Sequence, residues 1–254
     1  MTITDKSLLQ AGFKPKTASL SKRLIIQVEG HEKTGKTHFA LTAPGPIAYF
    51  GLDLGEEGVI EKFLAQGKEI ITPDDSIRVP NVIEMGPEGP KIDATSAWEQ
   101  MKRAFIACCK SPQVRSIVWD TATEVWELIR LARFGKLAQV LPVQYGPVNA
   151  EMRGLIRTAY DSNKNFVMLH KMKAEYINDR RTGKYERAGF GDSEYLVQVN
   201  LRTTYDPEER TFGIEILNCR QNMTLCNQAF AGDLCSFPML AIQIIEGTAL
   251  EDWE

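Results

Sequence analysis

The feature that most constrains the fold is a glycine-bounded loop between a short apolar segment and a short helix. Residues 30–37 read Gly-His-Glu-Lys-Thr-Gly-Lys-Thr and fit G-x-x-x-x-G-K-[ST], the phosphate-binding P-loop pattern. Residues 23–28 predict a buried strand before the loop, and residues 38–43 predict a helix after it. This order suits phosphate binding, because the backbone N–H groups of the loop and of the helix N-terminus point at the phosphates.

The motif predicts a role for each of its polar side chains. Lys36 reaches the β- and γ-phosphates, and the Thr37 hydroxyl is a ligand of Mg²⁺, so ATP and Mg²⁺ are the expected ligands. No N-K-x-D segment, which would read guanine, occurs in the sequence. The expected nucleotide-binding residues are Gly30, His31, Glu32, Lys33, Thr34, Gly35, Lys36, Thr37 and His38.

Two acids follow apolar segments that predict core strands. Asp120 ends residues 116–120 in the Walker-B pattern and would hold Mg²⁺ together with Thr37. The alternative is an Asp that caps the next helix. Asp53 ends another apolar run and would orient or deprotonate the attacking water, a role that Glu56 could fill instead. We prefer Asp53; a turn-forming aspartate is the alternative.

Two further residues at strand ends complete the expected catalytic set. His170 follows an apolar strand and would sense the γ-phosphate, or else serve as a hydrogen-bonded structural histidine. Arg220 follows the last strand and would reach the phosphates of a neighbouring subunit as an arginine finger, or else lie free on the surface. The expected catalytic residues are Lys36, Asp53, Glu56, His170 and Arg220.

The segment from Lys164 to Arg187 is basic and contains two tyrosines. It holds seven Lys or Arg and three acids, so its net charge is 7 − 3 = +4. Basic side chains interleaved with aromatic rings suit single-stranded nucleic acid, although a solvated hairpin or lid has the same composition. The expected contact residues are Lys171, Lys173, Tyr176, Arg180, Arg181, Lys184, Tyr185 and Arg187.

Strands that alternate with helices predict an α/β fold, with a mainly parallel central sheet flanked by helices. Residues 195–201 and 211–217 predict a C-terminal β-hairpin that extends this sheet. A helix is expected to begin at Ser96, which forms a capping-box pattern with Glu99, and another to span 122–140. The predicted organisation is a flexible leader (1–21), an ATPase core (22–222) and a C-terminal extension (223–254) with an exposed acidic end.

The bulk composition limits the class of protein. A chain of 254 residues, 43% hydrophobic, suits one globular domain with small additions. Its net charge of −3 gives no global basic field, so any nucleic acid must bind at a local patch. No apolar run is long enough to cross a bilayer, and the polar N-terminus has no signal-peptide pattern. The sequence therefore predicts a cytoplasmic protein without membrane contact.

The order of these motifs over residues 22–222 resembles the RecA-type recombinase core, most closely the compact phage-encoded RecA-like ATPases linked to single-strand annealing. Residues 30–37 match Walker A and residues 117–120 resemble Walker B. Asp53 stands where the family usually has Glu, and His170 where recombinases have Gln. Residues 216–220 resemble the strand that presents a basic residue to the adjacent protomer.

The resemblance implies a Mg²⁺-dependent, DNA-stimulated ATPase. It implies a homo-oligomer, in rings or filaments, on single-stranded DNA during recombination, annealing or replication. It also implies cooperation with single-strand-binding or other replication proteins, in the host cytoplasm if the gene is phage-encoded. Two alternatives stay open. One is a nucleoside-type kinase with residues 173–192 as its lid, and the other is a nucleotide-dependent scaffold with negligible turnover.

Overall fold

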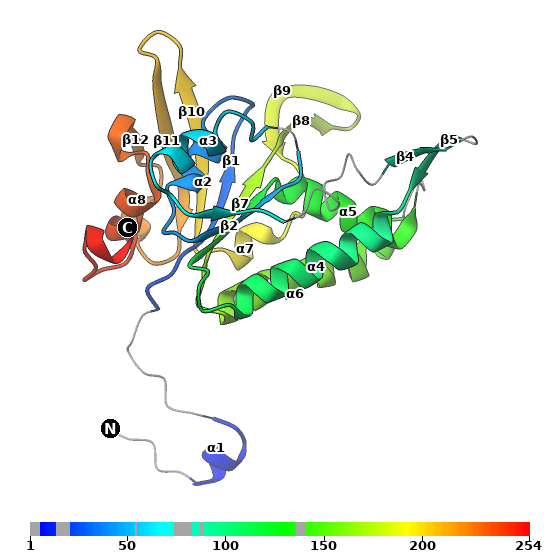
Figure 1. Ribbon diagram of the computed structural model, residues 1–254, viewed down its shortest axis with the longest axis horizontal. Coiled ribbons are helices and arrows are strands. Elements are labelled where there is room, and N and C mark those ends of the chain that lie inside the picture. The colour runs from blue at the N-terminus through cyan, green and yellow to red at the C-terminus, as the bar shows by residue number, and fades with distance from the viewer. Residues whose placement is uncertain (1–5, 14–20, 54, 74–82, 87–88, 136–140) are drawn as a thin grey trace.

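The computed structural model describes residues 6–13, 21–53, 55–73, 83–86, 89–135 and 141–254 (Figure 1). An eight-stranded sheet forms its centre, in the order β12-β11-β10-β1-β7-β6-β2-β3. Its strands are β1 (Ile25–Glu29), β2 (Ile47–Gly51), β3 (Ile70–Ile71), β6 (Ser116–Asp120), β7 (Asn165–His170), β10 (Val199–Asp206), β11 (Thr211–Cys219) and β12 (Ala229–Ala231).

The strands from β10 to β3 are all parallel, and β11 pairs antiparallel with both β10 and β12. The predicted fold class is therefore confirmed, including the C-terminal hairpin that extends the sheet. Strand β7 lies between β1, which leads into the glycine loop, and β6, which ends in Asp120. Because the strands are parallel, their carboxyl ends meet at one edge of the sheet, where ligands bind in open α/β folds.

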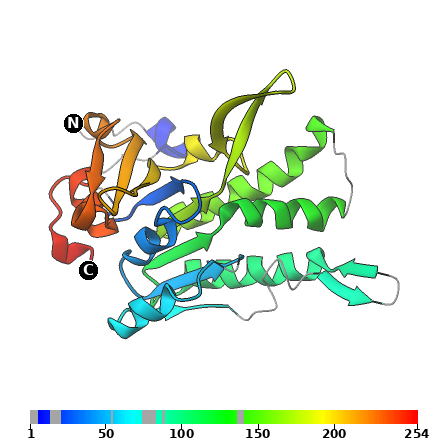
Figure 2. The same cartoon turned by 90° about the horizontal axis from the view of Figure 1, so that it is seen from above.

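One face of the sheet is covered by α4 (Ala94–Lys110), α5 (Ala122–Phe134), α6 (Gly146–Asp161) and the short α7 (Ser193–Leu196) (Figures 1 and 2). Their apolar sides pack with inward-facing strand residues such as Trp119 and Phe166. Helix α4 begins earlier than the predicted Ser96, because the Asp93 side chain accepts a hydrogen bond from the Ser96 N–H and caps it. Helix α5 ends at Phe134, and residues 136–140 lie outside the described residues.

The other face is covered by α2 (Lys36–Leu41), α3 (Ile60–Ala65) and α8 (Phe237–Ile244). The predicted boundary at residue 222 lies inside a continuous core, because α8 and Trp253 pack into the same apolar cluster as β1 and α2. Trp253 is only 1% exposed, which differs from the expected exposed end. Three-residue 3-10 helices, η4 (Met223–Leu225), η5 (Gly232–Leu234) and η6 (Leu250–Asp252), connect these C-terminal elements.

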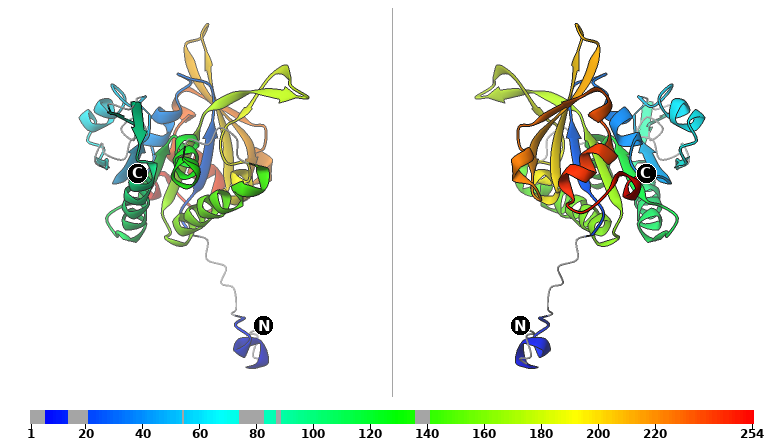
Figure 3. Two further views of the ribbon diagram at one scale, coloured as in Figure 1. Left: turned by 90° about the vertical axis from the view of Figure 1, so that its right-hand side faces the viewer. Right: turned by 90° about the vertical axis from the view of Figure 1, so that its left-hand side faces the viewer.

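Two hairpins project from the carboxyl edge of the parallel strands (Figure 3). One consists of the outer ends of β10 and β11, and the other of β8 (Met172–Ile177) and β9 (Arg180–Arg187). A third hairpin, β4 (Ile83–Gly86) with β5 (Gly89–Ile92), precedes α4. Of the predicted leader, residues 1–5 and 14–20 lie outside the described residues, and α1 (Lys6–Gln10) is a short helix.

Candidate nucleotide-binding site

Close contacts with neighbouring residues require glycine at two positions of the loop. At Gly30 an added Cβ would lie 2.2 Å from the Thr203 hydroxyl oxygen, so a side chain would push the loop away from β10. Gly35 caps α2 with φ 89°, a left-handed conformation that favours glycine, and its Cβ would lie 3.0 Å from the Phe212 ring. The loop is thus held against the β10–β11 hairpin.

Lys36 is folded back onto the loop. Its ammonium donates to the carbonyl oxygens of Gly30, at 2.8 Å, and His31, at 2.5 Å. Burial lowers the pKa of Lys36, and the nearby carboxylates of Asp120 and Asp53 oppose that shift. The lysine therefore already sits inside the curve of the loop, at the position where phosphate oxygens would arrive.

Thr37 and Asp120 meet at the start of α2. The Thr37 hydroxyl donates to Asp120 Oδ2 at 2.6 Å, and the Tyr49 hydroxyl donates to the same oxygen at 2.8 Å. Burial raises the pKa of Asp120, and the two hydroxyl donors partly offset this shift. The same burial and the carboxylate of Asp120 raise the pKa of Tyr49, which keeps its proton.

A cavity of about 710 Å³, called here the phosphate cavity, opens above the loop. It is lined by loop residues together with Asp53, Asp120, Thr121 and Lys171. The Asp53 carboxylate is about one-third exposed, and Lys171 Nζ lies 3.8 Å from Asp53 Oδ2. Lys171 also donates to Glu124 at 2.5 Å. The expected metal and water-positioning residues and the expected loop residues other than Thr34 therefore share one cavity.

The polar groups of this cavity fit a small hard cation. Among the described residues, no group of three or more His, Cys, Asp or Glu side chains is arranged to hold a metal. Thr37 and Asp120 instead offer a hydroxyl and a carboxylate oxygen, the ligands that Mg²⁺ takes when phosphate oxygens and water complete its shell. The site therefore suits a metal that arrives with a phosphate ligand.

Three expected catalytic residues, Glu56, His170 and Arg220, do not line the cavity. Glu56 is 8% exposed, and its carboxylate occupies the space beside Gly51 that a Cβ would fill. His170 is fully buried, and its Nδ1 lies 3.3 Å from the Ala188 carbonyl oxygen. Burial and the charge of Arg187 lower the pKa of His170 to about 3, so the ring is neutral. Its position agrees with the structural alternative.

Arg220 lies at the opposite edge of the sheet from the loop. Strand β11 is antiparallel to β10, so its last residue, Cys219, pairs with Val199 at the amino end of β10. The Arg220 guanidinium donates to the Tyr195 carbonyl oxygen at 2.5 Å. The structure therefore does not bring Arg220 to the loop of its own chain.

The segment expected to bind nucleic acid forms the β8–β9 hairpin, and its members differ in exposure. Tyr176 is 62% exposed and Tyr185 is 44% exposed. The hairpin also carries exposed cationic side chains, from Lys173, Arg180, Arg181 and Lys184. The Arg187 side chain is only 4% exposed and donates to the Phe190 and Gly191 carbonyl oxygens, so it anchors the hairpin base instead. Lys171, expected in the same set, lies in the phosphate cavity.

The hairpin touches the loop. The His31 and Tyr185 rings meet edge to face, with centroids 4.6 Å apart and planes at 82°. Arg181 donates to the Tyr185 hydroxyl at 2.8 Å. The ring pair thus places the loop in contact with an exposed basic and aromatic surface.

The sequence motifs do not predict a role at this site for three of its residues. Tyr49 bonds Asp120 from the neighbouring strand, Phe212 packs on Gly35, and Lys171 lies between Asp53 and Glu124. Tyr49 and Phe212 reach the site through strand pairing between distant parts of the chain, and Lys171 directly follows the last residue of β7. Two hints were present in the sequence: Tyr49 lies on the strand that precedes Asp53, and Lys171 follows His170, which was expected at the same edge of the sheet.

Comparison with known proteins identifies the domain. The family model described as "AAA domain" matches residues 22–195. Among solved structures, one titled "Crystal structure of the RadB recombinase" aligns with a TM-score of 0.48 and 12% sequence identity, over 82% of this chain and 86% of that chain. No curated protein sequence matches the chain. In the described part of the chain, every helix is too short or too polar to span a bilayer.

Proposed function

The chain belongs to the AAA domain family, and on that premise we propose that it is a Mg²⁺-dependent ATPase that acts on single-stranded DNA. The observation that carries the proposal is the meeting of Lys36, Thr37 and Asp120 in one cavity at a helix N-terminus. A lysine, a hydroxyl and a carboxylate in this arrangement are the groups that bind a triphosphate and its metal.

Each residue has a role that follows from its position. Lys36 leaves the loop carbonyls to contact the phosphates, and Thr37 and Asp120 hold Mg²⁺. The metal, when bound, neutralises charge on the phosphate oxygens. Asp53 orients the attacking water, and Lys171 lies close enough to Asp53 to hold it in place and to meet the terminal phosphate.

In this proposal the β8–β9 hairpin makes the contact with DNA. Its exposed tyrosines offer faces for base stacking, and Arg180, Arg181 and Lys184 offer charges for the backbone. The contact between His31 and Tyr185 supports coupling between nucleotide and DNA, because the same ring pair joins both surfaces. The proposed setting is phage-type recombination, annealing or replication in the cytoplasm, together with single-strand-binding or other replication proteins.

Assembly of identical copies completes the proposal. Arg220 lies at the sheet edge opposite the loop, so it can serve only a neighbouring site. Head-to-tail stacking of chains, in a ring or a filament, turns this edge toward the next loop. Hydrolysis would then require contact between protomers.

A kinase is the second candidate, because the β8–β9 hairpin touches the loop at His31 and carries two arginines at its tip, as a lid would. Product analysis separates the two. Free phosphate as the sole product supports the ATPase, whereas a phosphorylated nucleoside supports the kinase. Slow turnover that Asp53→Glu raises would favour a nucleotide-dependent scaffold.

The central experiment measures ATP hydrolysis with and without single-stranded DNA over a range of protein concentrations. We expect stimulation by DNA in the wild type, loss of activity in Lys36→Ala, and loss of the concentration dependence in Arg220→Ala. Turnover that is unaffected by DNA and by protein concentration would contradict the proposal. Full activity of Arg220→Ala would exclude Arg220 as an arginine finger and leave the rest of the proposed function in place.

A further inference from the structure

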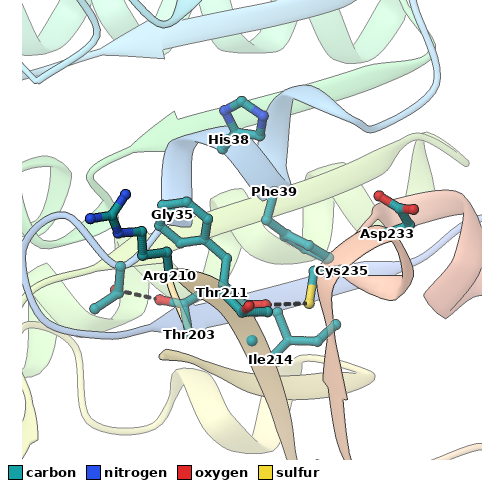
Figure 4. A pocket seen from close by; sticks show the side chains of 13 residues that line it. Gly35, His38, Phe39, Thr203, Arg210, Thr211, Ile214, Asp233 and Cys235 are labelled. Atoms are coloured by element: carbon teal, nitrogen blue, oxygen red, sulfur yellow. Dashed lines mark hydrogen bonds between the residues drawn. The ribbon is translucent and has the colours of Figure 1, made fainter. Parts of the chain in front are cut away.

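A second cavity, of about 330 Å³, adjoins the phosphate cavity and is called here the side cavity. Gly35, His38 and Phe212 line both cavities. Figure 4 shows His38 and Phe39 of α2 on one side of it and Ile214 and Cys235 on another. The residues to which the proposed function gives a role in hydrolysis, Lys36, Thr37, Asp120 and Asp53, do not line this cavity.

The direction of a bound triphosphate follows from the phosphate cavity. Lys36, Thr37, Asp120 and Asp53 line the phosphate cavity, and none of them lines the side cavity. Thr37 and Asp120 would hold the metal and Asp53 would orient the water, so the terminal phosphate would lie in the phosphate cavity. The α-phosphate and its nucleoside then leave in the other direction, past Gly35 and His38.

We propose that the side cavity is the nucleoside subsite, in which the base of the nucleotide stacks on the Phe212 ring. This inference rests on the proposed nucleotide binding and adds where the base lies and which residue selects for it. The Phe212 side chain is 47% exposed although it packs over Gly35, so part of the ring stays free to contact a ligand. Tyr205 supports it from the hairpin, with ring centroids 4.9 Å apart.

The lining suits a base and a sugar. Phe39 and Ile214 supply apolar surface, while Arg210 and Thr211 supply polar groups at the rim. The volume lies in the range of small-molecule sites, which combine apolar walls with a few polar groups. A base lodged here would cover Cys235, which is half-buried at the cavity wall.

The first test compares ATP with inorganic tripolyphosphate, which has no base, by calorimetry in the presence of Mg²⁺. Phe212→Ala should weaken ATP binding about tenfold, the effect of one lost base–aromatic stack, and leave tripolyphosphate binding within twofold. Phe212→Tyr should restore ATP binding. Tyr195→Ala removes an exposed ring that lines neither cavity; it is the control and should leave the binding of both ligands unchanged. Equal weakening of both ligands, or of neither, would overturn the inference.

The second test uses Cys235 as a reporter in the wild-type chain. Mass spectrometry follows its reaction with a maleimide in buffer, in tripolyphosphate and in ATP. We expect ATP to slow the reaction at least fivefold and tripolyphosphate to leave it unchanged. Equal rates in all three conditions would overturn the inference. Failure of the wild type to bind either ligand would instead refute the proposed nucleotide binding itself.

Discussion

The His31 imidazole and the Tyr185 phenol ring meet edge to face, with centroids 4.6 Å apart, and so join the phosphate-binding loop to the basic hairpin. His31 lines the phosphate cavity, and its carbonyl oxygen accepts a hydrogen bond from Lys36. The tip of the hairpin is otherwise exposed. This pair, together with Met172 of β8 in the wall of the phosphate cavity, is a direct contact through which occupancy of the cavity and of the hairpin can influence each other.

Breaking this ring pair should uncouple DNA from hydrolysis. An edge-to-face pair contributes roughly 0.5–1.5 kcal/mol, so Tyr185→Ala should lower the ratio of ATPase rates with and without DNA by about threefold or more. The double variant with His31→Ala should show little further loss, since both substitutions remove one contact. Tyr195→Ala, which removes an exposed ring from α7, is the control. Additive losses would show that the rings act separately.

Asp120→Asn should stabilise the free protein while it abolishes hydrolysis. The pKa of Asp120 is raised above 3.8 by burial, so its contribution to stability is present below that pH and is lost as pH rises through the folded-state pKa. At pH 7 the buried charge costs stability, and Asn keeps an oxygen for Thr37 and Tyr49. We expect a melting temperature a few degrees higher, about 1 kcal/mol, and ATPase activity lower by about 100-fold or more. A lower melting temperature would contradict this account.

His170 should make the fold sensitive to acid. Its folded-state pKa is about 3 against 6.5 in the unfolded chain, so stability present above pH 6.5 is lost as pH falls toward 3. At about pH 4.5 the loss reaches roughly 2–3 kcal/mol. Denaturant unfolding of the wild type and of His170→Gln at pH 7 and pH 4.5 measures it. The variant should lose less stability between the two pH values, and equal losses would exclude His170 as the cause.

Trp253 should be essential to the fold. It is 1% exposed and packs near Phe237, with ring centroids 6.0 Å apart. Trp253→Ala should lower the free energy of unfolding by about 3–5 kcal/mol. Leu250→Ala, at a residue 37% exposed in the same segment, should change it by less than about 1 kcal/mol. A stable chain truncated after residue 222 would show that these residues are dispensable.

Lys171→Ala should weaken ATP binding about tenfold, the contribution of one charge-assisted hydrogen bond. Lys171 lines the phosphate cavity and lies 3.8 Å from the Asp53 carboxylate. Lys110→Ala, at the exposed end of α4, removes the same charge far from the loop and serves as control. Calorimetry without DNA checks this. If Lys171→Ala changes DNA binding alone, the lysine belongs to the hairpin surface, as the sequence predicted.

The sequence predicted the centre of the site because local patterns determine it. Residues 30–37 and Asp120 follow buried strands whose apolar residues are consecutive, and parallel strands bring their carboxyl ends together. The partners of these residues could not be predicted. Phe212 reaches the cavity through the pairing of β10 with β11, which no spacing in the sequence reveals, and Lys171 was expected to contact nucleic acid instead.

Other elements were missed for different physical reasons. The β8–β9 hairpin was given only as an alternative, because it has no buried residue and so lacks the alternation of apolar and polar residues that identifies a strand. Helix α8 is too short and too uniformly apolar to show a helical period. The cap of α4 was assigned to Ser96, because its spacing to Glu99 fits a capping box, although the Asp93 carboxylate makes the bond.

The hydrogen bonds of Lys36 to Gly30 and His31 have a consequence for which anions the loop accepts. The lysine is already satisfied by its own loop, so an incoming ligand must compete with two internal acceptors. An anion with a single charge and few oxygens gains little from that exchange, whereas a polyphosphate replaces both carbonyls with stronger, charged acceptors. The internal hydrogen bonds of Lys36 therefore favour ligands that bring several charged oxygens to the loop over ligands that bring few.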